Sequence, residues 1–132
     1  MSRSRVPQLQ LALDHTRLDA ALETAQRLHQ QVDIVEAGTI LCFSAGIDAV
    51  RQLRQQLPAK TLVADFKVAD AGATLATLAF EAGANWMTVI CAAPLATFPA
   101  RWRWPISIRA ISRLSCSATG RWLRLSAGAS WA

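Results

Sequence analysis

The stretch ADFKVADAG, Ala64–Gly72, decides the fold that we expect for this chain of 132 residues. The apolar run Thr61–Ala64 leads into it, and a helix-like segment at 74–82 follows it. A short apolar run that ends in charged residues and is followed by a helix is typical of a buried parallel strand. Because side chains alternate along a strand, Asp65 and Lys67 are predicted to lie on the same face.

Asp70 follows this strand near the start of the next helix, where backbone amides and the helix dipole favour a carboxylate. Three charges at one strand end would be costly to bury singly. Together they can form ion pairs, hold a metal ion or stabilise a developing anion. A helix cap beside a surface ion pair explains the D-x-K-x-x-D spacing as well, so both interpretations stay open.

The preceding and following residues repeat the same strand–helix pattern. We expect an apolar loop at 40–43, strands at 8–13, 32–35, 61–64 and 86–90, and helices at 16–30, 45–57 and 74–82. Strands that alternate with helices indicate a parallel sheet joined by right-handed crossovers. The sequence therefore predicts an α/β fold.

Acidic residues follow three of these strands, namely Asp14, Glu36 and Asp65. The carboxyl ends of parallel strands form the active-site face in such folds, although acids there can also cap helices. Glu36 and Asp65 are the best pair of hard oxygen ligands for Mg²⁺. Lys67 could donate to an oxyanion, Asp70 could keep that ammonium protonated, and Asp14 could bind a substrate hydroxyl.

Charge and cysteine content narrow the class of protein. Residues 1–100 carry eight Lys/Arg against nine Asp/Glu, whereas residues 101–132 carry six Arg and no acid. The three cysteines are too few and too widely spaced for a disulfide framework or a zinc site, which indicates reduced thiols and a cytoplasmic protein. We expect no signal peptide and no membrane-spanning segment.

Four blocks carry a family resemblance: QLALD at 10–14, VDIVEAGTILC at 32–42, ADFKVADAG at 64–72 and EAGANWMTVICAA at 81–93. Together they resemble the 3-keto-L-gulonate-6-phosphate decarboxylases of the orotidine-5′-monophosphate decarboxylase superfamily. The D-x-K-x-x-D motif marks the superfamily, and the residues from Glu36 to Cys42 narrow it to the sugar-phosphate branch. The sibling 3-hexulose-6-phosphate synthases share the acids and the metal, and they remain an alternative.

The resemblance implies the N-terminal half of a (β/α)8 TIM barrel at residues 1–98. It also implies a homodimer that converts 3-keto-L-gulonate 6-phosphate to L-xylulose 5-phosphate and CO₂ in ascorbate catabolism. Glu36 and Asp65 would bind Mg²⁺, and Asp14, Glu36 and Lys67 would contact the sugar phosphate. Lys67, Asp70 and Asp65 would be catalytic, with Asp70 reaching into the partner subunit's site.

The resemblance ends near Phe98, and we expect residues 99–132 to form an irregular tail without an independent fold. The barrel's later phosphate-binding and proton-donating residues have no counterpart, so this chain is expected to be inactive. If the reading frame around the codons of Trp102 and Trp104 is moved one base back, it can encode the apolar helix that is expected after the fourth strand. This favours a frameshift. An ordered strand within 106–125 that pairs in register with the strand at 86–90 would count against it.

The alternative takes the tail at face value. Arg101 to Trp104 alternates cations with aromatic rings, as a segment that binds nucleic acid or a membrane surface does. No amphipathic stripe or known module frames these residues. We therefore expect neither a nucleic-acid nor a membrane partner.

Overall fold

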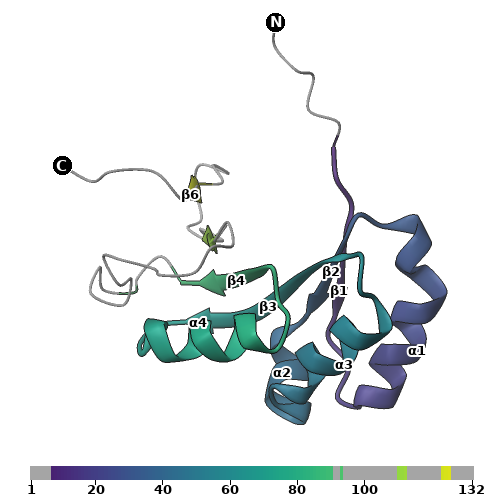
Figure 1. Ribbon diagram of the computed structural model, residues 1–132, viewed down its shortest axis with the longest axis horizontal. Helices are drawn as coiled ribbons and strands as arrows, with labels where there is room; N and C mark the ends of the chain where they lie inside the picture. Colours follow the sequence, from purple (N-terminus) through teal and green to yellow (C-terminus); the bar gives the residue numbers. More distant parts are fainter. Residues whose placement is uncertain (1–6, 91–92, 94–109, 113–122, 126–132) are drawn as a thin grey trace, which may run out of the picture.

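The computed structural model describes residues 7–90, residue 93 and the segments 110–112 and 123–125 (Figure 1). Four parallel strands lie side by side in chain order: β1 (Gln10–Leu13), β2 (Ile34–Ala37), β3 (Thr61–Val68) and β4 (Trp86–Val89). The connections contain α1 (Leu18–Leu28), the 3-10 turn η1 (His29–Gln31), α2 (Thr39–Ala45), α3 (Asp48–Gln56) and α4 (Gly72–Glu81). The four α-helices lie on one side of the sheet (Figure 1). This order of parallel strands confirms the predicted α/β half barrel.

Two further short strands belong to the region that was expected to be an irregular tail. β5 (Ala110–Ser112) pairs parallel with β4 through Thr88 and Ile111, and β6 (Leu123–Leu125) pairs antiparallel with β5. The pairing of β5 with β4 counts against a frameshift. Most of the predicted tail, including Arg101 to Trp104, lies outside the described residues.

The apolar core lies between the sheet and the helices. Leu13 of β1, Leu41 of α2, and Val50 and Leu53 of α3 are fully buried there. Burying each such side chain contributes about 1.5–3 kcal/mol. This packing places the carboxyl ends of the strands on a fixed edge of the sheet.

Several boundaries differ from the sequence prediction. The strand expected at 32–35 is β2 at Ile34–Ala37, so Glu36 lies within the strand and not after it. The expected apolar loop at 40–43 is part of helix α2, and Gly46 (φ 64°) separates this helix from α3. Ile40 and Phe43 lie about one turn apart on the exposed side of α2, so the run does not show a core-facing period. The strand expected at 61–64 continues to Val68, because it pairs with β4 beyond the acidic residue.

Candidate active site

The second half of β3 contains a β-bulge. The register of β3 against β4 shifts between Ala64 and Val68, and Lys67 adopts a left-handed backbone conformation with φ 47°. A residue other than glycine pays about 1–3 kcal/mol for such a conformation, and bulges often re-aim a side chain beside an active site. Asp65 and Lys67 lie on the same face, as predicted, because the Lys67 ammonium contacts the Asp65 carboxylate.

Asp65 is the centre of a hydrogen-bonded cluster although only 6% of its surface is exposed. The Thr39 hydroxyl lies 2.8 Å from Oδ2 and 2.9 Å from the Asp65 carbonyl oxygen. The Thr88 hydroxyl donates to Oδ1 at 2.5 Å. The Lys67 ammonium donates to Oδ2 and to the Thr39 hydroxyl. Three side chains from the same end of the sheet, Thr39, Lys67 and Thr88, therefore bond to this carboxylate.

These contacts determine the charge of Asp65. Burial alone would raise its pKa, but hydrogen bonds from Lys67, Thr88 and Thr39, together with the Lys67 charge, outweigh burial and lower the pKa. Asp65 is therefore ionised at neutral pH and holds an ammonium whose side chain is half exposed.

Glu36 and Asp14 lie at the same end of the sheet. Glu36, in β2, is 5% exposed and accepts a hydrogen bond from the Gln10 side chain of β1. Asp14 follows β1 and is exposed, and its Oδ1 lies 2.1 Å from where a Cβ on Gly38 would be. Gly38 therefore permits the close approach of the carboxylate.

The pKa of the Cys42 thiol in α2 responds to the negative charges of these acids. Burial raises its pKa to about 12, and the negative charges of Asp65, Glu36 and Asp14 act in the same direction. The negative charges of all three predicted acids therefore act on the same thiol, that of Cys42. This arrangement is what a site for a cation or a cationic group requires.

Asp70 bonds to the backbone of its own loop. It is exposed after β3, and its Oδ1 accepts the Ala71 amide at 2.6 Å. Ala71 precedes α4 in a left-handed conformation with φ 53°, and no side chain caps the helix. The ammonium of Lys67 pairs with Asp65, whereas sequence reasoning had suggested Asp70 as its partner.

Thr39 and Thr88 are the residues that sequence reasoning missed. Thr39 begins α2, and Thr88 lies in β4, where a threonine is an ordinary strand residue. Their contacts to Asp65 bridge 26 and 23 positions of the chain. Only the parallel arrangement of β2, β3 and β4 brings these residues together.

Among the side chains that the structure describes, Glu36 and Asp65 are the two buried carboxylates that could hold a hard cation. Glu36 pairs in register with Val63, so Asp65 lies close to Glu36 along the neighbouring strand. Mg²⁺ commonly takes one or two protein carboxylates and completes its shell with water and substrate oxygens. Within the described part of the chain, no group of three or more His, Cys, Asp or Glu residues is arranged to hold a metal. Within the described residues, Glu36 and Asp65 are thus a pair of carboxylates and not part of a larger acidic cluster.

Comparisons with known proteins show the family of this chain. The sequence profile of the orotidine 5′-phosphate decarboxylase / HUMPS family matches residues 7–100. A 3-keto-L-gulonate-6-phosphate decarboxylase of Escherichia coli is 66% identical over 91 residues, which are 69% of this chain and 41% of that protein. The crystal structure of a 3-keto-L-gulonate-6-phosphate decarboxylase from Vibrio cholerae has 48% identity and a TM-score of 0.68, covering 69% of this chain and 42% of that one.

A 3-hexulose-6-phosphate synthase structure from Salmonella typhimurium superposes equally well, with a TM-score of 0.67, but at 34% identity, over 69% of this chain and 43% of that one. The chain thus spans about two fifths of the length of the curated relatives that it matches. No helix in the described segments is long and apolar enough to cross a membrane.

Proposed function

Since the chain belongs to the orotidine 5′-phosphate decarboxylase / HUMPS family, we propose that it carries half of a Mg²⁺-dependent decarboxylase active site. The substrate is 3-keto-L-gulonate 6-phosphate, and the products are L-xylulose 5-phosphate and CO₂. The observation that carries the proposal is the Lys67 ammonium held on the buried, ionised Asp65 at the carboxyl end of β3. The 66% identity to a decarboxylase of this name supports the choice of substrate.

The reaction needs positive charge beside the oxygen that becomes an anion. Loss of CO₂ from a β-keto acid leaves an enediolate, and a preorganised ammonium beside its oxygen lowers the barrier. Lys67 supplies this charge, because its side chain is half exposed while Asp65 below it is buried. Mg²⁺ bound by Glu36 and Asp65 would stabilise negative charge on substrate oxygens as a Lewis acid.

The exposed acids take the remaining roles. Asp14 is exposed at the end of β1 and accepts a hydrogen bond from a substrate hydroxyl, while Glu36 and Lys67 complete the sugar-phosphate contacts. Asp70 is exposed and points its carboxylate at its own loop, at the Ala71 amide. We propose that it completes the site of a second copy in a cytoplasmic homodimer.

The length of the chain limits its activity. The part of the chain that matches covers only about two fifths of its curated relatives, so this part lacks the groups that the rest of those proteins supplies. Loss of one general acid typically costs about 10²–10⁴ in rate. We therefore expect little or no turnover by the 132-residue chain.

The test measures CO₂ release from 3-keto-L-gulonate 6-phosphate with Mg²⁺. Two proteins are compared: the chain as it stands, and a version with one base restored near codons 97–101. The second version also tests whether a longer frame exists despite the pairing of β5 with β4. In the active version, Lys67→Ala should lower kcat/KM about 10²–10³-fold, because it removes charge made for the transition state. Lys60→Ala is the matched control, since Lys60 donates to the Val32 carbonyl at 2.6 Å, at the opposite end of the sheet.

Each outcome decides one part of the proposal. Robust turnover by the 132-residue chain would disprove the expected inactivity. A longer frame without decarboxylase activity would disprove the assigned substrate, and activity in the synthase reaction would replace it with the sibling function. Equal losses from Lys60→Ala and Lys67→Ala would remove the special role of Lys67.

A further inference from the structure

The bulge in β3 leaves one backbone amide to be satisfied by a side chain. The register shift between Ala64 and Val68 takes Lys67 out of the regular pairing with β4. The Lys67 amide donates instead to the Thr88 hydroxyl oxygen at 2.9 Å. Regular pairing resumes directly afterwards, where the Ile90 amide donates to the Val68 carbonyl at 3.0 Å. The Thr88 hydroxyl therefore takes the place of a missing ladder acceptor.

The same hydroxyl has a second role. It accepts the Lys67 amide and donates its one proton to Asp65 Oδ1 at 2.5 Å, so both functions of the hydroxyl are used. Thr88 is 5% exposed, so water cannot readily replace these two bonds. Valine has the same shape but lacks the hydroxyl, whereas serine keeps it. Threonine here is thus explained by its hydroxyl and not by its β-branched shape.

The two bonds fix the backbone and the carboxylate that the site uses. The left-handed conformation of Lys67 is unfavourable by itself and persists only where neighbours determine it. In that conformation the Lys67 ammonium contacts Asp65 and Thr39. We propose that Thr88 is a positioning residue that holds the Lys67 backbone and the Asp65 carboxylate in register with each other. Its importance for catalysis rests on the proposed function, whereas its contacts do not.

The test uses the fact that the chain contains two lysines, Lys60 and Lys67. The full chain labelled with ¹⁵N-lysine gives two backbone amide signals, which Lys60→Arg assigns. In Thr88→Val, exchange of the Lys67 amide should accelerate about 10-fold or more, because its acceptor is lost. The Lys60 amide, which donates to the Leu57 carbonyl at the other end of the sheet, should not change.

Two variants control this result. Thr88→Ser keeps the hydroxyl and should restore slow exchange at Lys67. Thr77→Val removes a hydroxyl that donates to Ala73 within α4, away from the site, and should change neither signal. If Thr88→Val fails to fold, both lysine amides lose protection from exchange. The exchange rate of the Lys67 amide in the parent chain then tests the proposal. Exchange of its Lys67 amide at the rate of an unstructured peptide would overturn the proposal.

The second readout separates positioning from simple support. Mn²⁺ binding to the full chain is followed by electron paramagnetic resonance, with Mn²⁺ alone as the probe. Thr88→Val should weaken Mn²⁺ binding about 10-fold, because losing a hydrogen bond that orients a metal-binding carboxylate has effects of this size. Thr88→Ser should restore the affinity. Unchanged affinity despite fast Lys67 exchange would overturn the positioning role. No Mn²⁺ binding by the parent would disprove the proposed metal site, while the amide result would still decide the Thr88 contact.

Discussion

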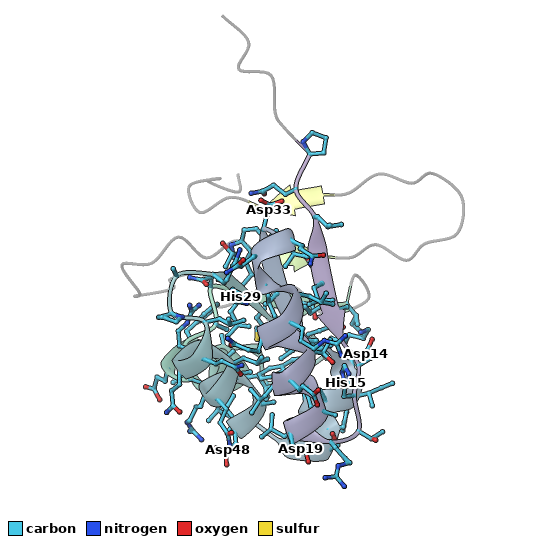
Figure 2. All side chains as sticks on the ribbon, turned by 90° about the vertical axis from the view of Figure 1, so that its right-hand side faces the viewer. Asp14, His15, Asp19, His29, Asp33 and Asp48 are labelled. Carbon is cyan, nitrogen blue, oxygen red and sulfur yellow. The ribbon has the colours of Figure 1, made fainter. Side chains whose placement is uncertain are left out.

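The two ends of the parallel sheet are held together in different ways. Before the strands begin, side chains bond to the backbone: Asp33 accepts the Leu9 amide at 2.8 Å, and Asn85 accepts the Leu62 amide at 2.8 Å. After the strands, charged side chains bond to other side chains, as Lys67 and Asp65 do. Figure 2 shows Asp33 near the first end of β1 and Asp14 near the other.

Arg54 of α3 makes several hydrogen bonds at the end of the sheet where the strands begin. Its guanidinium donates to the carbonyls of Gly83, Leu57, Pro58 and Lys60 and to the Asn85 side chain, at 2.6–3.1 Å. Backbone acceptors stay in place whatever a ligand does, so this end stabilises the fold. The other end contains a strained backbone and an ion pair that a ligand can engage. The comparison teaches that the two ends of the sheet already differ in this half barrel: backbone acceptors hold the first end, and side-chain contacts hold the end that we propose to be reactive.

The largest effect that we expect concerns Cys42, below the reactive end. Its pKa, raised from 9.0 to about 12, lowers the thiolate fraction at pH 8 about 10³-fold. Iodoacetamide at pH 8 should therefore alkylate Cys42 far more slowly in the folded chain than in urea, as measured by peptide mass spectrometry. The sign also predicts a pH effect on stability. The unfolded thiol ionises above about pH 9, so stability should fall between pH 9 and pH 12.

Glu36→Gln is the matched test of the cause, because it removes one of the negative charges that raise the Cys42 pKa. Alkylation of the folded variant should become faster. Equal alkylation rates for the folded parent and the folded variant would show that Glu36 does not act on this thiol.

The second effect concerns the stabilising end. Arg54→Ala should lower the free energy of unfolding by about 2–4 kcal/mol, because it leaves several partly buried acceptors without a donor. Arg51→Ala is the control on the same helix, since the Arg51–Asp48 ion pair is exposed and should contribute less than about 1 kcal/mol. Urea unfolding measures both. Similar values for the two variants would contradict the assigned role of this end.

The sequence predicted the stabilising frame better than the reactive end. Apolar periodicity located the β-strands and α1, and the acids after the strands located Asp14, Glu36 and Asp65 at one edge. Helix α2 was missed because its Ile40 and Phe43 are exposed, so the run lacks a core-facing period.

The bulge at Lys67 and the roles of Thr39 and Thr88 have another cause. They depend on contacts between strands, which neither local propensity nor spacing along one chain encodes. A short polar residue at a strand end becomes informative only once the neighbours of that strand are known.

The third effect tests the approach of Asp14 to Gly38 at the reactive end. A Cβ at Gly38 would lie 2.8 Å from the Leu13 carbonyl oxygen as well as 2.1 Å from Asp14 Oδ1. The backbone of Gly38 has φ −65°, so the cost of Gly38→Ala is steric and not conformational. We expect a loss of about 1–3 kcal/mol in urea unfolding. In an Asp14→Ala background the loss should shrink, and an unchanged loss would show that only the Leu13 carbonyl matters.

The smallest effect that we expect concerns the strained backbone of Ala71 and tests whether folding needs it. Ala71 precedes α4 with φ 53° and ψ 34°, a conformation that costs an alanine about 1–2 kcal/mol and glycine almost nothing. Glycine loses more entropy on folding, which offsets about half of that gain. Ala71→Gly should therefore stabilise the chain by about 0.5–1 kcal/mol, seen as a higher urea midpoint. Ala73→Gly, two residues on and inside α4, should instead destabilise it by about 1 kcal/mol. A gain in stability from Ala71→Gly with a loss from Ala73→Gly would show that folding does not need the strained Ala71 backbone. A loss of stability in both variants would mean that the left-handed turn before α4 does not form.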